Sequence, residues 1–221
     1  MTIEQLISPS VPTLHPDDTG NRALDIMDEA KLSELPLVNN DEYIVLVKES
    51  DLLEWEHPEA ALSTAGSLNF KPAIPASAHP FEAIRIMTQA ELDILPVISE
   101  ELKYLGAVTK DMLLKYIAEN SGIDNPGGII TLEIAPRNYT LYEIARICEN
   151  EDVVILNMQV HTNKQGMLEI TLKLNRSAIS AVVSSFERHS YHVVNVFGEE
   201  LNRDDITGKY NLLMNYINMG G

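Results

Sequence analysis

The chain contains an internal repeat with a period of 60 residues, and this repeat limits the folds open to it. Residues 23–38 read ALDIMDEAKLSELPLV and residues 83–98 read AIRIMTQAELDILPVI. The match extends without a gap over residues 12–53 and 72–113. Self-similarity at a fixed period indicates a repeated structural unit, and a unit this small cannot bury its own apolar face. The two copies are therefore expected to pair.

Each copy predicts a helix followed by two strands. Ala23, Ile26, Met27 and Ala30 fall at i, i+3, i+4 and i+7, which places them on one helix face, and the same residue types recur in the second copy. A Leu-Pro pair follows each helix. Proline fixes its own φ and donates no hydrogen bond, so it suits the start of a strand and ends the helix before it.

The residues around these elements predict where they begin and end. Thr19 is expected to cap the first repeat helix, and His79 followed by Pro80 the second. The remaining predicted elements of this half are a short helix at the N-terminus, a strand at 11–14, strands at 43–47 and 104–108, and helices at 52–55 and 112–119.

This pattern resembles the CBS domain, which occurs as a tandem pair. The shared features are a helix, then Leu-Pro-Val-Ile, then Gly-hydrophobic-hydrophobic-Thr, then Asp-hydrophobic-hydrophobic, over roughly the first 120 residues. We assign residues 1–60 to repeat 1 and 61–121 to repeat 2. The resemblance implies a pseudo-twofold pair of small α/β units whose clefts commonly bind adenosine-containing ligands.

The second half of the chain follows a different pattern. Residues 122–128 form a linker, within a stretch (NSGIDNPGG) that holds three glycines and a proline. Residues 129–198 then predict a βαββαβ order, which is ferredoxin-like. The expected elements are a strand at 129–134, a helix at 140–149, strands at 153–161 and 167–174, a helix at 176–189 and a strand at 191–197.

A βαββαβ domain behind a CBS pair resembles the ACT domain, which typically binds amino acids where two modules meet. The resemblance implies a candidate effector loop at Pro136, Arg137, Asn138, Tyr139 and Thr140. The family's usual loop contains a glycine, which lets the backbone approach a ligand closely, and this loop has none. The architecture is also similar to that of accessory proteins linked to acetoin utilisation, which fixes no ligand.

The tail, residues 199–221, predicts one more helix from Asp204 to Asn218. Its first residues are acidic, which suits a helix N-terminus, and Leu212, Leu213, Tyr216 and Ile217 form an apolar stripe. The CBS pair or a second subunit would give this stripe a surface to cover. The predicted fold class is thus α/β and α+β: a CBS pair, an ACT-like domain and a C-terminal helix.

The resemblance also implies nucleotide-binding residues. The CBS ribose signature is Thr/Ser-x-x-Asp after the second strand, whose hydroxyl and carboxylate hold the sugar hydroxyls. Repeat 1 has Asp51, but Lys48 stands where the hydroxyl should be; repeat 2 has Thr109, but Asp111 comes one residue early and Lys110 lies between. The Leu-Pro strands complete the predicted set with Leu35, Pro36, Leu95 and Pro96.

Two interpretations of these residues are open. In the first, Thr109 and Asp111 bind ribose after a local shift, and Lys48 or Lys110 receives a phosphate. In the second, Thr109 is only a helix cap, Asp51 and Asp111 complement helix dipoles, and the clefts are empty.

The charge of the chain excludes some partners. The net charge is -17, and residues 1–124 carry 8 basic and 22 acidic side chains, net -14. Such a surface repels nucleic acids, anionic membranes and polyphosphates, so a neutral or cationic adenosine derivative is favoured.

We expect a cytoplasmic protein, because no apolar run could span a bilayer and no basic leader opens the sequence. The single cysteine, Cys148, is expected to be a buried thiol.

The sequence predicts no catalytic or metal site. His189 and His192 do not share a helix face, and His161 is distant in sequence, so a metal site is not expected. None of the common nucleotide-phosphate, hydrolase or metalloprotease motifs occurs. We therefore expect a regulatory protein without cofactors that senses AMP, ADP, ATP or S-adenosylmethionine. The alternative is a structural module with degenerate clefts that binds an unidentified protein target.

The protein is predicted to be a homodimer. The paired repeats would expose an apolar helical face, and a lone ferredoxin-like sheet leaves edge strands that usually pair. Light scattering at micromolar concentration should give twice the chain mass. A strict monomer of 24.6 kDa would contradict the prediction.

Overall fold

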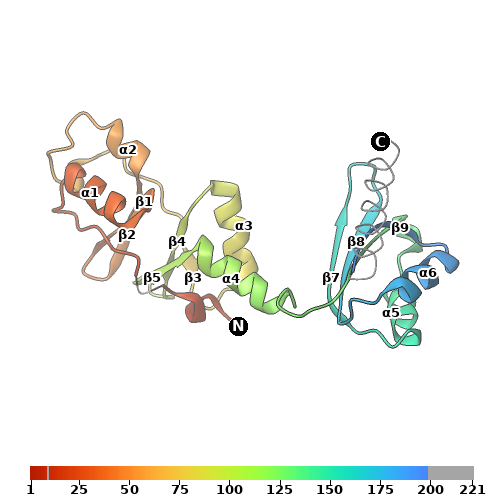
Figure 1. Cartoon of the computed structure of the whole chain (residues 1–221). Coiled ribbons are helices and arrows are strands. Elements are labelled where there is room, and N and C mark those ends of the chain that lie inside the picture. Colours follow the sequence, from red (N-terminus) through yellow and green to blue (C-terminus); the bar gives the residue numbers. More distant parts are fainter. Residues whose placement is uncertain (9, 199–221) are drawn as a thin grey trace, which may run out of the picture. The chain divides into compact units, whose positions relative to one another are not determined.

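The computed structural model describes residues 1–8 and 10–198, which form two compact units that divide between Ile117 and Ala118 (Figure 1). Both units mix helices and strands, in agreement with the predicted fold class of α/β and α+β. No helix within these ranges is long and apolar enough to cross a membrane. The predicted tail helix, residues 204–218, lies outside the described residues.

Unit 1 contains both repeats, and each is built around an antiparallel hairpin. Repeat 1 consists of α1 (Gly20–Ala30), β1 (Glu34–Asn39), β2 (Glu42–Lys48), α2 (Glu49–Leu53) and the 3-10 turn η2 (Leu62–Thr64). Repeat 2 consists of β3 (Ile74–Pro75), α3 (Pro80–Ala90), β4 (Ile94–Ile98), β5 (Tyr104–Thr109) and α4 (Lys110–Asn120).

Both repeat helices begin where the sequence predicts. The Thr19 hydroxyl accepts a hydrogen bond from the Arg22 amide at 3.2 Å. In the second copy the His79 ring nitrogen Nδ1 accepts from the Phe81 amide at 3.1 Å. Each cap satisfies an amide that the first helical turn leaves without a partner. The predicted apolar faces are the buried ones, at Ala23 and Met27 and at Ala83 and Met87.

The gapless match between the repeats is wrong beyond the hairpin. Leu37 pairs with Val45 in repeat 1, whereas Val97, 60 residues after Leu37, pairs with Gly106. The turn of the second hairpin is therefore one residue longer, and the offset becomes 61. As a result Asp51 is the third residue of α2 and Asp111 the second residue of α4.

Some predicted limits were also wrong. The strand expected at 11–14 is a single bridge, in which the Leu14 amide donates to the Pro36 carbonyl at 2.8 Å. Pro12 supplies no amide for a longer ladder. Helices α2 and α4 start earlier than predicted, directly after their strands, because their first amides bond to the carbonyls of Ser33 and Asp93.

The N-terminal segment packs in repeat 2 rather than repeat 1. The 3-10 helix η1 (Ile3–Leu6) buries Ile3 and Leu6 in the core that also contains Ile94 and Leu113. The Ser8 amide then donates to the Ala107 carbonyl of β5 at 2.8 Å.

A close approach to Gly106 makes this packing fit. Gly106 has φ +140, and a Cβ there would collide with the Ile7 side chain. On repeat 1 the equivalent place is taken by residues 65–73, which join η2 to β3 and are called here the linker between the repeats: the Leu46 amide donates to the Phe70 carbonyl at 2.9 Å. The linker between the repeats thus hydrogen-bonds to the hairpin of repeat 1, and the N-terminal segment hydrogen-bonds to the hairpin of repeat 2.

A buried carboxylate joins the two repeats. Glu34 is 3% exposed, and its Oε1 accepts hydrogen bonds from the amides of Asp93 and Ile94, the latter at 3.1 Å. The Ser33 hydroxyl lies 2.7 Å from Asp93 Oδ2 and 3.1 Å from Glu34 Oε2, and its single proton serves one carboxylate at a time. Residues at the same place in the two repeats therefore meet each other.

Unit 2 has the predicted βαββαβ order. Its elements are β6 (Ile129–Ile134), the 3-10 turn η3 (Pro136–Asn138), α5 (Leu141–Asn150), β7 (Ile155–Thr162), β8 (Leu168–Leu174), α6 (Ser180–Arg188) and β9 (His192–Phe197). The sheet is antiparallel in the order β7-β8-β6-β9. Its core lies between the sheet and the two helices and includes Cys148, whose burial raises the pKa of the thiol to about 11.

Replacing the buried carboxylate should weaken unit 1. We expect Glu34→Ala to lower the free energy of unfolding by about 3 kcal/mol, because two amides lose a charged acceptor. Urea unfolding followed by the fluorescence of Trp55, the only tryptophan of the chain, reports on unit 1. Glu29→Ala, at an exposed position of α1, is the matched control and should change stability by less than about 0.5 kcal/mol. Equal effects of the two changes would contradict the role of Glu34.

Candidate functional site

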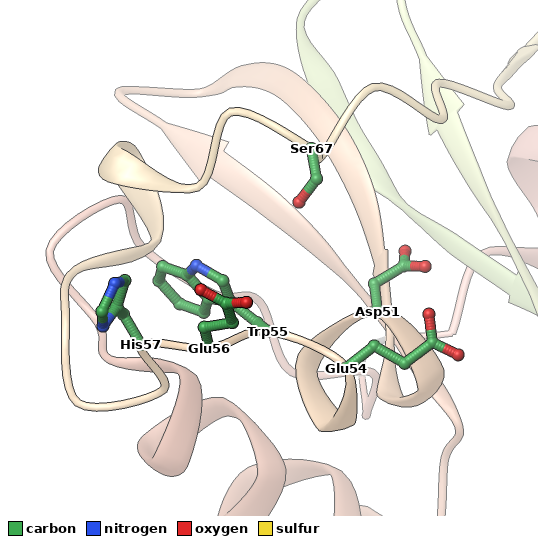
Figure 2. Close-up of a pocket in the computed structure, with 6 residues that line it drawn as sticks. All are labelled: Asp51, Glu54, Trp55, Glu56, His57 and Ser67. Atoms are coloured by element: carbon green, nitrogen blue, oxygen red, sulfur yellow. The ribbon is translucent and has the colours of Figure 1, made fainter.

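The cavity that contains a predicted ribose-binding residue lies at the end of α2. It has a volume of about 370 Å³ and is lined by Asp51, Glu54, Trp55, Glu56, His57 and Ser67 (Figure 2). Asp51 and Glu54 come from α2 and its C-terminal end, the next three residues from the segment that leaves it, and Ser67 from the linker between the repeats. The cavity therefore forms where the end of repeat 1 folds back beneath the linker.

Local sequence places these side chains. α2 has five residues, and its last turn is completed by hydrogen bonds from the amides of Glu54 and Trp55 to carbonyls of α2. The chain then turns at Pro58, whose carbonyl accepts from the Asn21 amide of α1 at 2.9 Å. Gly20 permits this approach, because a Cβ there would lie 3.0 Å from the Pro58 oxygen and 3.1 Å from the Trp55 ring. Trp55 is consequently held against the start of α1.

The lining combines an aromatic ring with acidic groups. Trp55 is half-buried, and three carboxylates (Asp51, Glu54 and Glu56) share the cavity with it. Carboxylates accept hydrogen bonds from sugar hydroxyls and attract cations, and an indole ring offers a face for a flat ring or a cation. Phosphate groups would be repelled. The lining thus suits a flat, hydroxyl-bearing ligand without a large negative charge.

The described residues of unit 1 also line further cavities, among them the following three. One of about 290 Å³ is lined by Lys31, Ser33, Glu49, Asp93 and residues of α1. An apolar one of about 170 Å³ lies between α3 and α4 and includes Lys110, and one of about 340 Å³ is lined by residues of repeat 1 and the start of the linker, among them Leu37, Asn39 and Leu62. Of the predicted nucleotide-binding residues, only Asp51 and Lys110 line any of the four.

Thr109 acts as a helix cap in repeat 2. Its hydroxyl accepts a hydrogen bond from the Met112 amide at 3.3 Å, and Asp111 is exposed at the second position of α4. The two side chains therefore occupy the first turn of α4, as both interpretations of the sequence require. A ligand hydroxyl at Thr109 would have to share the oxygen with this amide.

Both candidate phosphate-binding lysines have protein partners. Lys110 Nζ lies 2.6 Å from Asp93 Oδ1, and this hydrogen bond, with one from Ser33, holds the pKa of Asp93 below its usual value. Lys48 Nζ lies 4.7 Å from the centroid of the Phe70 ring, a cation–π contact. A phosphate at either lysine would compete with these partners.

The remaining predicted residues line none of these four cavities. Leu35, Pro36, Leu95 and Pro96 are all buried in β1 and β4. In unit 2, Pro136, Arg137 and Asn138 of the candidate effector loop form η3 and are exposed, whereas Tyr139 packs against the core. Thr140 occupies the cap position of α5 as predicted, but its side chain makes no capping hydrogen bond.

Five lining residues of the Asp51 cavity were not predicted: Glu54, Trp55, Glu56, His57 and Ser67. The break in helical pattern at His57-Pro58 was visible in the sequence, and so was the single tryptophan. The return of the linker between the repeats, which brings Ser67 to these residues, was not visible in the sequence. Among the residues that the structure describes, no group of three or more histidine, cysteine or acidic side chains is placed to hold a metal ion.

Comparison with known families identifies unit 1. The model of the CBS domain matches residues 3–57 and again residues 70–119. These residues form a tandem pair of CBS domains. The first match begins in η1, although this segment packs with the second repeat.

Solved structures of CBS pairs resemble about half of the chain. A CBS domain pair/ACT domain protein from Thermotoga maritima is 17% identical, with a TM-score of 0.49, over 54% of this chain and 98% of that one. The CBS domains of a transcriptional regulator from Streptococcus pneumoniae are 20% identical, with a TM-score of 0.46, over 52% and 98%. CBSX2 from Arabidopsis thaliana is 18% identical, with a TM-score of 0.47, over 53% and 94%, and CBSX2 has also been solved in complex with AMP.

Removing the Lys110 side-chain charge should raise the pKa of Asp93. In the folded protein that pKa is depressed, so the pair stabilises unit 1 above the unfolded pKa and this contribution is lost as pH falls through the folded one. Lys110→Met should therefore reduce the loss of stability on acidification, and an NMR titration should show the Asp93 carboxyl titrating at higher pH. Lys71→Met, in the exposed linker, is the control. An unchanged Asp93 titration in Lys110→Met would rule out the pairing.

Proposed function

We propose that the protein is a non-catalytic regulator whose CBS pair senses an adenosine-type ligand. CBS pairs are generally regulatory, and the observation that carries the proposal is the cavity at Asp51. A carboxylate at the third position of α2 lies in a cavity with an aromatic ring, as recognition of a ribose and a purine requires. Thr109 and Asp111 of repeat 2 offer a second, smaller set of polar groups.

The acidic lining ranks the candidate ligands. Asp51, Glu54 and Glu56 would repel the triphosphate of ATP more strongly than the single phosphate of AMP, and would attract the sulfonium and ammonium groups of S-adenosylmethionine. The net charge of -14 on residues 1–124 acts in the same direction. We therefore propose the order S-adenosylmethionine, AMP, ADP, ATP for decreasing affinity.

Unit 2 is proposed to act as an ACT-like module for dimerisation or for a second effector. Its βαββαβ topology supports this assignment, with β7 and β9 at the edges of the sheet. The absence of glycine between β6 and α5 argues for dimerisation over amino-acid binding.

Thermal unfolding with each of the four compounds tests the sensor proposal. A ligand present at about 100 times its dissociation constant stabilises the folded state by about 2.7 kcal/mol, which a melt detects. Quenching of Trp55 would report binding directly. Asp51→Asn should abolish the shift while leaving the apo melt nearly unchanged, because an amide keeps the shape and loses the charged acceptor.

Repeat 2 supplies the matched controls. Thr109→Val and Asp111→Asn should leave the shift intact if the Asp51 cavity is the site, although loss of the Thr109 cap can cost about 1 kcal/mol in the apo protein. A shift abolished by Thr109→Val and kept by Asp51→Asn would move the site to repeat 2. If none of the four compounds moves the wild-type melt, the sensor proposal fails and the alternative remains, a structural module that binds another protein through degenerate clefts.

A further inference from the structure

An apolar groove lies between α3 and α4 of repeat 2 (Figure 1). Its volume is about 170 Å³, and apolar side chains of both helices line it, among them Ile84, Leu113 and Ile117. Leu114 also lines the groove and is 67% exposed, and Lys110 is the charged residue of the lining. Exposed apolar surface that is gathered in one place marks a contact with another molecule. The groove suits an occupant that offers an apolar side chain with a negative charge beside it.

The equivalent surface of repeat 1, on α1 and α2, carries such a side chain. Equivalent positions of α1 and α3 differ by 60 residues and those of α2 and α4 by 61, so Leu53 corresponds to Leu114 and Glu49 to Lys110. Leu53 is 69% exposed. Glu49 stands four residues before it, which places the carboxylate and the leucine on one side of α2. Repeat 1 thus presents an exposed leucine next to an acid.

The charges of the two helical surfaces are also complementary. Residues 20–31 and 49–54 of repeat 1 carry 2 basic and 6 acidic side chains, net -4, whereas the equivalent residues 80–91 and 110–115 of repeat 2 carry 3 of each, net 0. The sign is reversed at three pairs of exposed, equivalent positions: Asp25 and Arg85, Lys31 and Glu91, Glu49 and Lys110. The surface of repeat 1 therefore repels its own copy and attracts that of repeat 2.

A second copy of the chain can meet these surfaces in two orientations. Head-to-head, repeat 1 packs on repeat 1, and a residue near the twofold axis meets its own copy, so that Asp25 faces Asp25 and Glu49 faces Glu49. Head-to-tail, repeat 1 packs on repeat 2 of the second copy. Because the repeats share one fold, residues near the local pseudo-twofold axis then meet their equivalents, Asp25 with Arg85 and Glu49 with Lys110. The second orientation replaces repulsion by attraction and forms each contact twice.

We propose that two copies of unit 1 associate head-to-tail, with Leu53 of each copy in the groove beside Leu114 of the other and Glu49 near Lys110. Lys110 keeps its hydrogen bond to Asp93, since an ammonium group has three donors and serves two carboxylates at once. Repeat 1 supplies the inserted leucine and repeat 2 supplies the groove. The association involves no ligand, so it stands apart from the sensor function proposed above.

Cross-linking of cysteine variants of the full chain tests the orientation. Leu53→Cys and Leu114→Cys each place a thiol at an exposed position, whereas the native Cys148 is buried and its raised pKa keeps it unreactive. A short bis-maleimide should join Leu53→Cys chains to co-expressed Leu114→Cys chains and should join neither variant to itself. Glu100→Cys, in the exposed turn between β4 and β5, is the control and should cross-link with none of them. Cross-linking of Leu53→Cys with itself would show head-to-head pairing and overturn the proposal.

Reversed charges give an independent test. Asp25→Arg or Arg85→Asp alone should raise the dissociation constant of the dimer about tenfold, because each change sets like charges opposite each other in both contacts. Co-expression of the two variants should give a mixed dimer with close to wild-type affinity, since the reversed charges meet in one contact and the unchanged ones in the other. Glu100→Arg is the control and should leave the affinity unchanged. Sedimentation velocity over about 1 to 100 μM protein measures these constants.

Three results would contradict head-to-tail association. The first is an equal affinity of the single charge variants and their mixture. The second is a dimer that persists without a cross-link between Leu53→Cys and Leu114→Cys, because the contact would then lie elsewhere in the chain. The third is a wild-type chain that stays monomeric at about 100 μM. Thermal melts of each variant, compared with that of the wild type, separate weaker association from a loss of folding in unit 1.

Discussion

The carboxylate of Glu34 holds the two repeats of unit 1 in register. A charged group with almost no exposure is costly unless it is hydrogen-bonded, and here two amides donate to Oε1 of Glu34. The donors come from the start of β4 in the other repeat, so the interaction is available only when the repeats pair in this one arrangement. Apolar cores would tolerate small slips between the repeats; this carboxylate does not.

The hydrogen bonds at the contact between the repeats also involve Lys110, one of the predicted nucleotide-binding residues. Asp93, whose amide donates to Glu34, also accepts hydrogen bonds from Ser33 and Lys110, so one short segment links β1, β4 and the start of α4. The Lys110 side chain is thereby held at the contact between the repeats, against Asp93. The cavity at Asp51 lies outside this network, and none of its three carboxylates takes part in it. The two repeats have thus diverged in use: polar groups at the head of α4 stabilise the pair, whereas those at the end of α2 line a cavity.

Local signals in the sequence predicted most of the elements. Thr19 and His79 cap their helices because capping depends on residues only two or three positions apart, and the limits of β6 followed from a clear alternation of residues. Contacts between distant segments could not be predicted in this way. Glu34 reads as one more surface acid, the extra residue in the second hairpin is hidden by a match that continues past it, and nothing near Lys110 indicates Asp93. For the site, Asp51 was predicted from the family signature, while Trp55 and Ser67 come together only through the path of the linker.

The placement of η1 in repeat 2 has a consequence for how the chain acquires its structure. Residues of the segment 3–8 bond to Ala76, Ala78 and Ala107, some 70 to 100 positions later in the sequence, so these bonds cannot form until almost all of unit 1 is present. Repeat 1 receives its own added segment, the linker around Phe70, much sooner. Contacts between residues so far apart in sequence slow folding, because the loop between them must close first. The contacts of η1 therefore tie the completion of the repeat 2 core to the closure of a long loop.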